Sequence, residues 1–320
     1  MSKISLVVGN GLSISFGNQS GISYKFDSQQ PLNWNVICPS TGGLLIDNLP
    51  SLKRLWEKNI SKPHFEIFGF ALDKFYCNLI GLDSFKTTLE ARHFLTIAFS
   101  EYSLLQSSKL NGDWTWFQWL ELHQSEIKGA LSFNYDLLLE SAFDKLGITY
   151  HSSQVNHIRN GIPLVKPHGS VDFEMADGMI DIHIEYPLNN FVDLNNAPMK
   201  RLLHTSLVYP RKQAHCIIPN EANKYENYQW VLQSSIQFKP VLKDSDYCLF
   251  IGISYLPCDR VEIDRIINTL SEECEIIIAN PYPPKELLAK IKNRRYTVWS
   301  SLDGPIDERG NLYSLKQLKT

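Results

Sequence analysis

The distribution of apolar residues along the chain predicts short buried strands that alternate with helices. Each predicted strand is an apolar run of four or five residues that stops abruptly at a glycine or a polar residue. Five such runs occur, at Ile4–Val8, Ala130–Phe133, Ile162–Val165, Tyr247–Ile251 and Glu275–Ala279. Helical spacing of apolar residues marks residues 137–146, 228–241, 260–270 and 284–292. This alternation is typical of an α/β protein with a mostly parallel sheet flanked by helices.

One long segment interrupts the alternation. Within residues 45–126, the stretches 64–82 and 86–107 carry apolar residues at helical spacing, and residues 114–122 are rich in aromatic side chains. We therefore predict a helical insertion at residues 45–126, inside a domain formed by residues 1–44 and 127–320.

Composition and charge narrow the function classes. The chain has 320 residues, 43% of them hydrophobic, and a formal net charge of −3. This balance argues against a general electrostatic surface for nucleic acid or for an anionic membrane. The apolar run before Gly9 is too short for a signal peptide, and no apolar run reaches the length of a membrane span. We expect a soluble, cytoplasmic protein.

Cysteine spacing argues against a structural metal or a disulfide framework. The six cysteines lie at positions 38, 77, 216, 248, 258 and 274, and none forms a Cys-x-x-Cys pair. A zinc ribbon normally needs such pairs. Reduced thiols and no bound metal are the simpler expectation.

The residues that directly follow the predicted strands are the candidates for ligand binding, because open α/β sheets bind ligands beyond the carboxyl ends of their strands. The first group is Gly9-Asn10-Gly11-Leu12-Ser13. Glycines at this place let the backbone approach a phosphate, and the helix that follows offers amide groups. The alternative is an ordinary tight turn, which glycine also favours.

The second group offers side chains for hydrogen bonding, and the third offers a possible general base. Asn134 and Asp136 follow one strand and could hydrogen-bond a ribose or a carboxamide, although Asp136 could simply cap the next helix. His168 follows the next strand, in Lys166-Pro167-His168-Gly169-Ser170, and an imidazole there could act as a general base. A lone histidine is more often a surface or core residue.

The last two groups lie in the C-terminal half. Gly252-Ile253-Ser254-Tyr255 follows one strand, with Asp259 shortly after it, and Asn280 follows another strand. Asn280 could reach a pair of hydroxyl groups on a ligand. Each of the five groups has an ordinary structural explanation, so their common position and their order carry the functional interpretation.

This order resembles the sirtuin superfamily, and more closely its bacterial sirtuin-like branch that degrades NAD in anti-phage defence. The resemblance covers roughly residues 4–17, 128–170 and 208–282. It implies a Rossmann-like fold that binds NAD. It also implies a role for each matched residue: Gly9, Asn10, Gly11 and Ser13 at the pyrophosphate, Asn134 and Asp136 at the nicotinamide and its ribose, His168 as the catalytic base, Gly252 and Ser254 at the phosphates and adenine ribose, and Asn280 at the adenine ribose.

The sequence departs from the sirtuin pattern in two places. Deacylating sirtuins carry a four-cysteine zinc module between the His-Gly and Gly-x-Ser motifs, whereas this chain has only Cys216 and Cys248 there. The first loop also lacks the Gly-Ile-Pro-Asp-Phe-Arg continuation and reads Phe16-Gly17-Asn18-Gln19 instead. The first departure disfavours deacylation, and the second indicates a different lid over nicotinamide.

The resemblance implies an NAD glycohydrolase that releases nicotinamide and ADP-ribose, with NAD as its substrate and no metal. Two alternatives stay open. One is a sensor or complex subunit that binds NAD or ADP-ribose without turnover, and the other is an enzyme that transfers ADP-ribose to a protein. A free NAD-consuming enzyme would harm its own cell, so we expect control by a homo-oligomer or by a partner defence protein.

Overall fold

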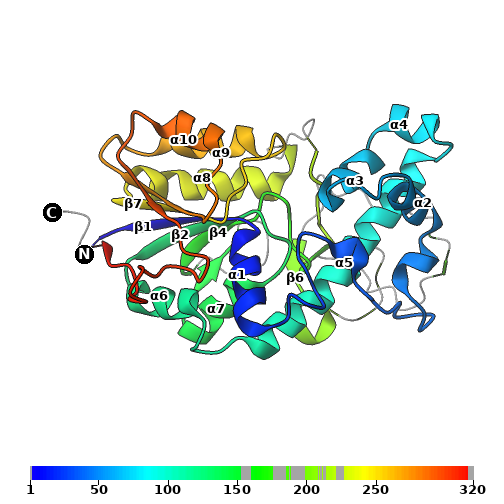
Figure 1. Ribbon diagram of the computed structural model, residues 1–320, viewed down its shortest axis with the longest axis horizontal. Coiled ribbons are helices and arrows are strands. Elements are labelled where there is room, and N and C mark those ends of the chain that lie inside the picture. Colours follow the sequence, from blue (N-terminus) through cyan, green and yellow to red (C-terminus); the bar gives the residue numbers. More distant parts are fainter. Residues whose placement is uncertain are drawn as a thin grey trace.

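A seven-stranded sheet forms the centre of the molecule (Figure 1). The computed structural model describes residues 2–152, 160–175, 185–186, 188, 199–207, 209, 211, 214–220 and 227–315. The sheet has the order β3-β4-β2-β1-β7-β8-β9, and its strand pairs are parallel. Its strands are β1 (Ile4–Val8), β2 (Ile127–Ser132), β3 (Tyr150–His151), β4 (Ile162–Val165), β7 (Tyr247–Ile251), β8 (Glu275–Ala279) and β9 (Tyr296–Trp299).

The strand order is that of a Rossmann fold. Without the two-residue strand β3, the order β4-β2-β1-β7-β8-β9 matches the doubly wound order 3-2-1-4-5-6. Strands β2 and β4 are added on one side of β1, and the next strand of the sheet, β7, is added on the other side. The position between β1 and β7 is therefore the switch point at which such sheets bind ligands. The predicted α/β fold with a parallel sheet is confirmed.

Burial on both faces explains why the central strands read as continuous apolar runs. All five residues of β1 are buried. Because side chains alternate along a strand, Ile4, Leu6 and Val8 join one hydrophobic core and Val7 joins the second. Figure 1 shows α8 (Gln229–Lys243), α9 (Arg260–Thr269) and α10 (Lys285–Ile291) on one face, and α1 (Gly11–Ser20), α6 (Thr115–His123) and α7 (Leu138–Leu146) on the other.

Residues 45–126 are mainly helical. Helix α5 (Ser84–Lys109) contacts both α7 and α1, and its far end is covered by α2 (Pro50–Lys58), α3 (His64–Ala71) and α4 (Lys74–Leu79) (Figure 1). Helix α6 packs against the sheet instead, where the rings of Trp119 and Trp299 lie 5.9 Å apart. The boundary of the insertion stays a prediction.

The five predicted strands and the four predicted helices of the sheet domain are confirmed, although β2 begins three residues earlier than the apolar pattern indicated. The edge strands β3 and β9 were not predicted. Neither was the antiparallel pair of β5 (Phe173–Met175) and β6 (Met199–Arg201). Short 3-10 turns occur at Pro31–Asn33, Leu45–Asn48 and His204–Ser206. Within the described residues, no helix has the length and apolar character that a membrane span requires.

Candidate functional site

Five loops gather at the carboxyl edge of the sheet because its strands run in the same direction. They follow β1, β2, β4, β7 and β8, and they carry the five groups that the sequence singles out. The loops after β1 and β7 touch: the amide of Gly9 donates to the carbonyl of Ile251 over 2.9 Å, and the amide of Gly11 donates to that of Gly252 over 3.1 Å. The candidate site therefore surrounds the switch point.

A hydrogen-bonded cluster joins the first two loops. The Asn134 side-chain amide donates to the carbonyl of Gly9 over 3.1 Å and to Ser13 Oγ over 3.3 Å. Ser13 Oγ donates in turn to Asp136 Oδ2 over 2.6 Å. All three side chains are buried. The cluster fixes Asn134 and Asp136 against the start of helix α1.

Asp136 has a structural task as well. Its Oδ1 accepts a hydrogen bond from the amide of Leu138, the first residue of α7, over 3.1 Å. Burial raises the pKa of Asp136, and the hydrogen bond from Ser13 and the charge of Lys166 offset only part of that effect. Both carboxylate oxygens are therefore used inside the protein, which makes Asp136 a buttress of the loop that carries Asn134.

Lys166 is hydrogen-bonded to the loop that carries Asn134 and Asp136. Its Nζ donates to the carbonyl oxygen of Asp136 and to Glu140 Oε1, each over 2.8 Å. The Lys166 side chain is fully buried and Glu140 is nearly so. Burial raises the pKa of Glu140, and the charge of Lys166 is the largest of the effects that oppose this. A buried ion pair thus connects the loop after β4 to helix α7.

His168 lies beside this cluster in an aromatic environment. Its ring centroid is 5.2 Å from that of Phe133 and 6.1 Å from that of Tyr135, the two residues that flank Asn134. Its Nε2 lies 3.0 Å from Asp259 Oδ1, across the carboxyl edge. The imidazole is buried.

The glycines at the switch point allow two backbones to meet. A Cβ atom built on Gly11 would lie 2.3 Å from the Cα of Gly252, and one built on Gly252 would lie 2.2 Å from the Cα of Gly11. Gly252 also has a φ of +60°, which disfavours any other residue. The amides of Gly9 and Gly11 are already bonded inside the protein. What these glycines provide here is close packing of the two loops.

Asn280 braces the loop after β7. Its side-chain amide donates to the carbonyl of Ile253 over 3.0 Å, and its Oδ1 accepts from the amide of Tyr282 over 2.9 Å. Ser254, the next residue of that loop, is exposed. The structure thus places Asn280, Gly252 and Ser254 together on the C-terminal side of the switch point.

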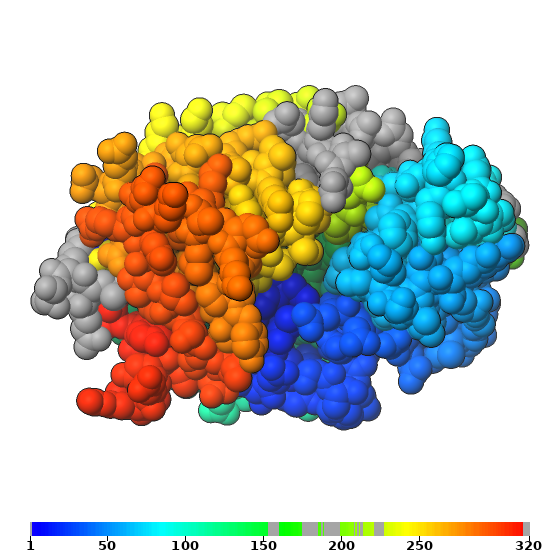
Figure 2. Space-filling view, turned by 45° about the horizontal axis from the view of Figure 1, so that its top comes forward, coloured from blue at the N-terminus to red at the C-terminus, as the bar shows by residue number. Residues whose placement is uncertain are grey.

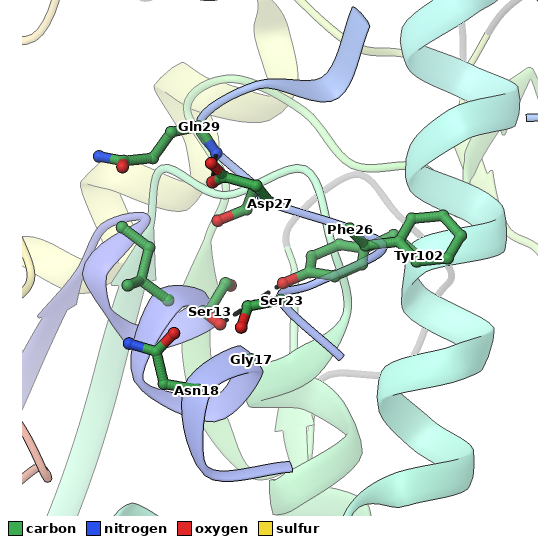
Figure 3. Close-up of a pocket in the computed structure, with 10 residues that line it drawn as sticks. Ser13, Gly17, Asn18, Ser23, Phe26, Asp27, Gln29 and Tyr102 are labelled. Carbon is green, nitrogen blue, oxygen red and sulfur yellow. Dashed lines mark hydrogen bonds between the residues drawn. The ribbon is translucent and has the colours of Figure 1, made fainter. Parts of the chain in front are cut away.

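A pocket of about 350 Å³ opens beside the cluster (Figure 3). Helix α1 contributes Ser13 and Asn18 to its wall, the following segment contributes Asp27 and Gln29, and α5 contributes Tyr102. The Tyr102 hydroxyl donates to the carbonyl of Ser13 over 3.4 Å. Figure 2 shows the N-terminal segment, in dark blue, at the surface between the orange C-terminal half and the light-blue helices. The volume of the pocket is in the range of small-molecule sites.

Among the described residues, no group of three or more His, Cys, Asp or Glu side chains is arranged to hold a metal ion. The polar cluster at the switch point consists of an amide, a hydroxyl and a buttressed carboxylate, which suits hydrogen bonding to a ribose or to a carboxamide.

No protein-family model and no curated protein matches the sequence. Solved structures of Sir2 proteins are similar to the chain at low scores. Sir2Tm bound to a propionylated peptide aligns over 93% of this chain and 87% of its own, with 9% identity and a TM-score of 0.39. A Sir2 homologue in complex with NAD aligns over 94% and 85%, with 12% identity and a TM-score of 0.37.

The sequence did not identify Lys166 and Asp259 as parts of the site. Lys166 stood next to the His168 motif, directly after a buried apolar run, where a charged side chain needs a partner. That signal was available. Asp259 gave a weaker signal, because an aspartate at the start of a helix is usually a cap.

Lys166→Met is expected to lower the free energy of unfolding by about 3 kcal/mol, because it leaves the buried Glu140 carboxylate without its nearest cation. Adding Glu140→Gln should restore part of that loss, since the amide carries no charge. Urea unfolding of the two variants and the wild type measures both effects. Equal midpoints for Lys166→Met and the wild type would show that the pair contributes nothing.

Proposed function

We propose that this protein binds NAD at the carboxyl edge of its sheet and hydrolyses the bond between nicotinamide and ribose. The observation that carries the proposal is the arrangement of Asn134 and His168. Asn134 is fixed by Ser13 and Gly9, and its neighbours Phe133 and Tyr135 lie against the His168 ring. The amide and the imidazole therefore belong to the loops after the neighbouring strands β2 and β4, at the carboxyl edge of a dinucleotide-binding fold.

The proposed reaction needs few groups from the protein. The nicotinamide nitrogen is cationic in NAD, so it leaves with the electron pair of the broken carbon–nitrogen bond. Water attacks the anomeric carbon of the ribose, and His168 accepts the proton that the water loses. Asn134 orients the ribose or the water, and Asp136 keeps Asn134 in place. The products are nicotinamide, ADP-ribose and one proton.

The remaining matched residues are proposed to hold the dinucleotide. The close packing of Gly11 and Gly252 places the start of helix α1 beside the loop after β7. A pyrophosphate there would gain from the positive end of the α1 dipole. Ser254, exposed on that loop, offers a hydroxyl to a phosphate or to the adenine ribose, and Asn280 holds the loop in position.

Nicotinamide release from NAD by the purified protein, followed by chromatography, tests the enzyme proposal. We expect nicotinamide and ADP-ribose in equal amounts. Calorimetry with NAD on the same sample separates the enzyme from a sensor. Heat of binding without any product would favour the sensor, and neither heat nor product would reject NAD as the ligand.

One observation favours the sensor as the second candidate. The amides of Gly9 and Gly11 are bonded to the backbone of the loop after β7, and His168 Nε2 lies beside the Asp259 carboxylate. The two glycine amides therefore already have partners inside the protein, and the charge beside His168 comes from the protein itself. A protein that only binds a nucleotide needs no side chain that is free to transfer a proton.

Following the resemblance, we further propose that the enzyme is a regulated effector of anti-phage defence, controlled through a homo-oligomer or a partner defence protein. Loss of cellular NAD is harmful, so the activity has to wait for a trigger. Sedimentation combined with the turnover assay tests this point. Full, constitutive turnover by a monomeric sample would contradict the proposed control.

Ser13→Ala is expected to lower the kcat of nicotinamide release by about tenfold or more, since it removes the hydroxyl that joins Asn134 to Asp136. Ser15→Ala is the matched control: Ser15 lies on the same helix, is also buried, and its Oγ has no hydrogen-bond partner within the described part of the chain. Equal activity of the two variants would remove Ser13 from the site.

A further inference from the structure

We propose that Asp259 is a positioning residue for His168, and this rests on the proposed function. The carboxylate comes from the opposite half of the fold. His168 follows β4 and Asp259 lies at the start of α9, after β7, with β2 and β1 between those strands. Neighbouring strands are about 4.8 Å apart, so the two strand axes are separated by about 14 Å. Nevertheless, His168 Nε2 and Asp259 Oδ1 lie only 3.0 Å apart.

Asp259 does not perform the usual task of an aspartate at the start of a helix. It occupies the N-cap position of α9, but its side chain makes no capping hydrogen bond to that helix. The carboxylate lies by His168 instead, and 12% of its side chain is exposed, against 5% for the imidazole. The two atoms lie at ion-pair distance without the geometry of a hydrogen bond, so the contact between them is one of charge.

Asp259 lies at the start of a helix, and His168 lies against two aromatic rings. The positive end of the ten-residue helix α9 stabilises a negative charge at Asp259. The contacts of Phe133 and Tyr135 with His168 are contacts between rings. Glu262, one turn further along α9, is close enough for the charges of His168 and Asp259 to act on its carboxyl, whose pKa is raised by burial.

A carboxylate 3.0 Å from Nε2 acts on a histidine base through its charge. It stabilises the imidazolium that forms when the base accepts a proton. Asp259 does not itself touch the reacting atoms in this proposal. It acts through His168, and it couples the loop after β7 to the loop after β4.

A double-mutant cycle of nicotinamide release tests the proposal. We expect Asp259→Asn to lower kcat by at least about tenfold with little change in KM, and Asp259→Glu to recover part of the loss because it keeps the charge. In a His168→Ala background, Asp259→Asn should have almost no further effect, since the residue acts through His168. Asp83→Asn is the control, because Asp83 is an N-cap aspartate that does cap its own helix.

A second measurement keeps the proposal independent of turnover. Nitrogen-15 NMR of the His168 ring should show different ring-nitrogen signals in the wild type and in Asp259→Asn, because the variant removes the charge 3.0 Å from Nε2. If the wild type releases no nicotinamide, the proposed function fails and the NMR result alone decides about Asp259. Unchanged ring signals, an equal loss of kcat in both backgrounds, or a higher kcat in Asp259→Asn would overturn the proposal.

Discussion

Replacing His168 with alanine is expected to lower the kcat of nicotinamide release by about a hundredfold to ten-thousandfold, with little change in the affinity for NAD. The loss is that of a general base that accepts the proton of the attacking water. Binding is expected to survive, since the proposed contacts to the dinucleotide lie in the loops after β1 and β7. Initial rates and calorimetry on the same samples measure the two quantities separately.

The alanine variant also leaves the Asp259 carboxylate buried beside an empty space. His168→Gln, which keeps a polar side chain of similar length, guards against a loss of folding, and thermal unfolding monitors it. His151→Ala is the matched control, because His151 lies on the edge strand β3, away from the switch point. A fully active His168→Gln variant would refute the assignment of the base.

Gly169→Ala is expected to lower the free energy of unfolding by about 4 kcal/mol. Gly169 has a φ of +76°, and a Cβ atom built there would lie 1.5 Å from the carbonyl oxygen of His215. The same carbonyl accepts a hydrogen bond from the amide of Ser170 over 3.0 Å. The backbone must therefore shift next to His168, and urea unfolding measures the cost.

Gly21→Ala isolates the part of that cost that comes from the close contact. Gly21 ends helix α1 with a φ of +73°, and a Cβ atom there would meet no atom within 4 Å. It should lose only about 1 kcal/mol, the usual cost of left-handed backbone in a residue with a side chain. Similar losses for the two variants would show that the approach of Gly169 to His215 is not a constraint.

The fold was predictable wherever burial on both faces produced an uninterrupted apolar run. β1 and β8 are such strands, and their loops had to share one edge once the sheet was parallel. β9 escaped prediction because Tyr296 is exposed and only Trp299 is buried, which gives an edge strand little apolar pattern. β3 has two half-buried residues and offers no pattern to recognise.

The positions of the candidate residues were predictable, but their partners were not. Parallel strands dictate that Asn134 and His168 lie at the same edge. That Ser13 bonds Asp136, 123 residues away along the chain, depends on how helix α1 packs, which no local pattern encodes. The pairing of His168 with Asp259 depends in the same way on the path of the loop after β7.

Nicotinamide release from NAD, compared between the wild type and Asn134→Ala, tests the central claim most directly. The proposed enzyme predicts equimolar nicotinamide and ADP-ribose from the wild type, a much lower rate from Asn134→Ala, and a wild-type rate from Asn33→Ala, a control at an exposed asparagine. A wild type that binds NAD but releases no nicotinamide, alone or with candidate partner proteins, would contradict the claim and leave a nucleotide sensor.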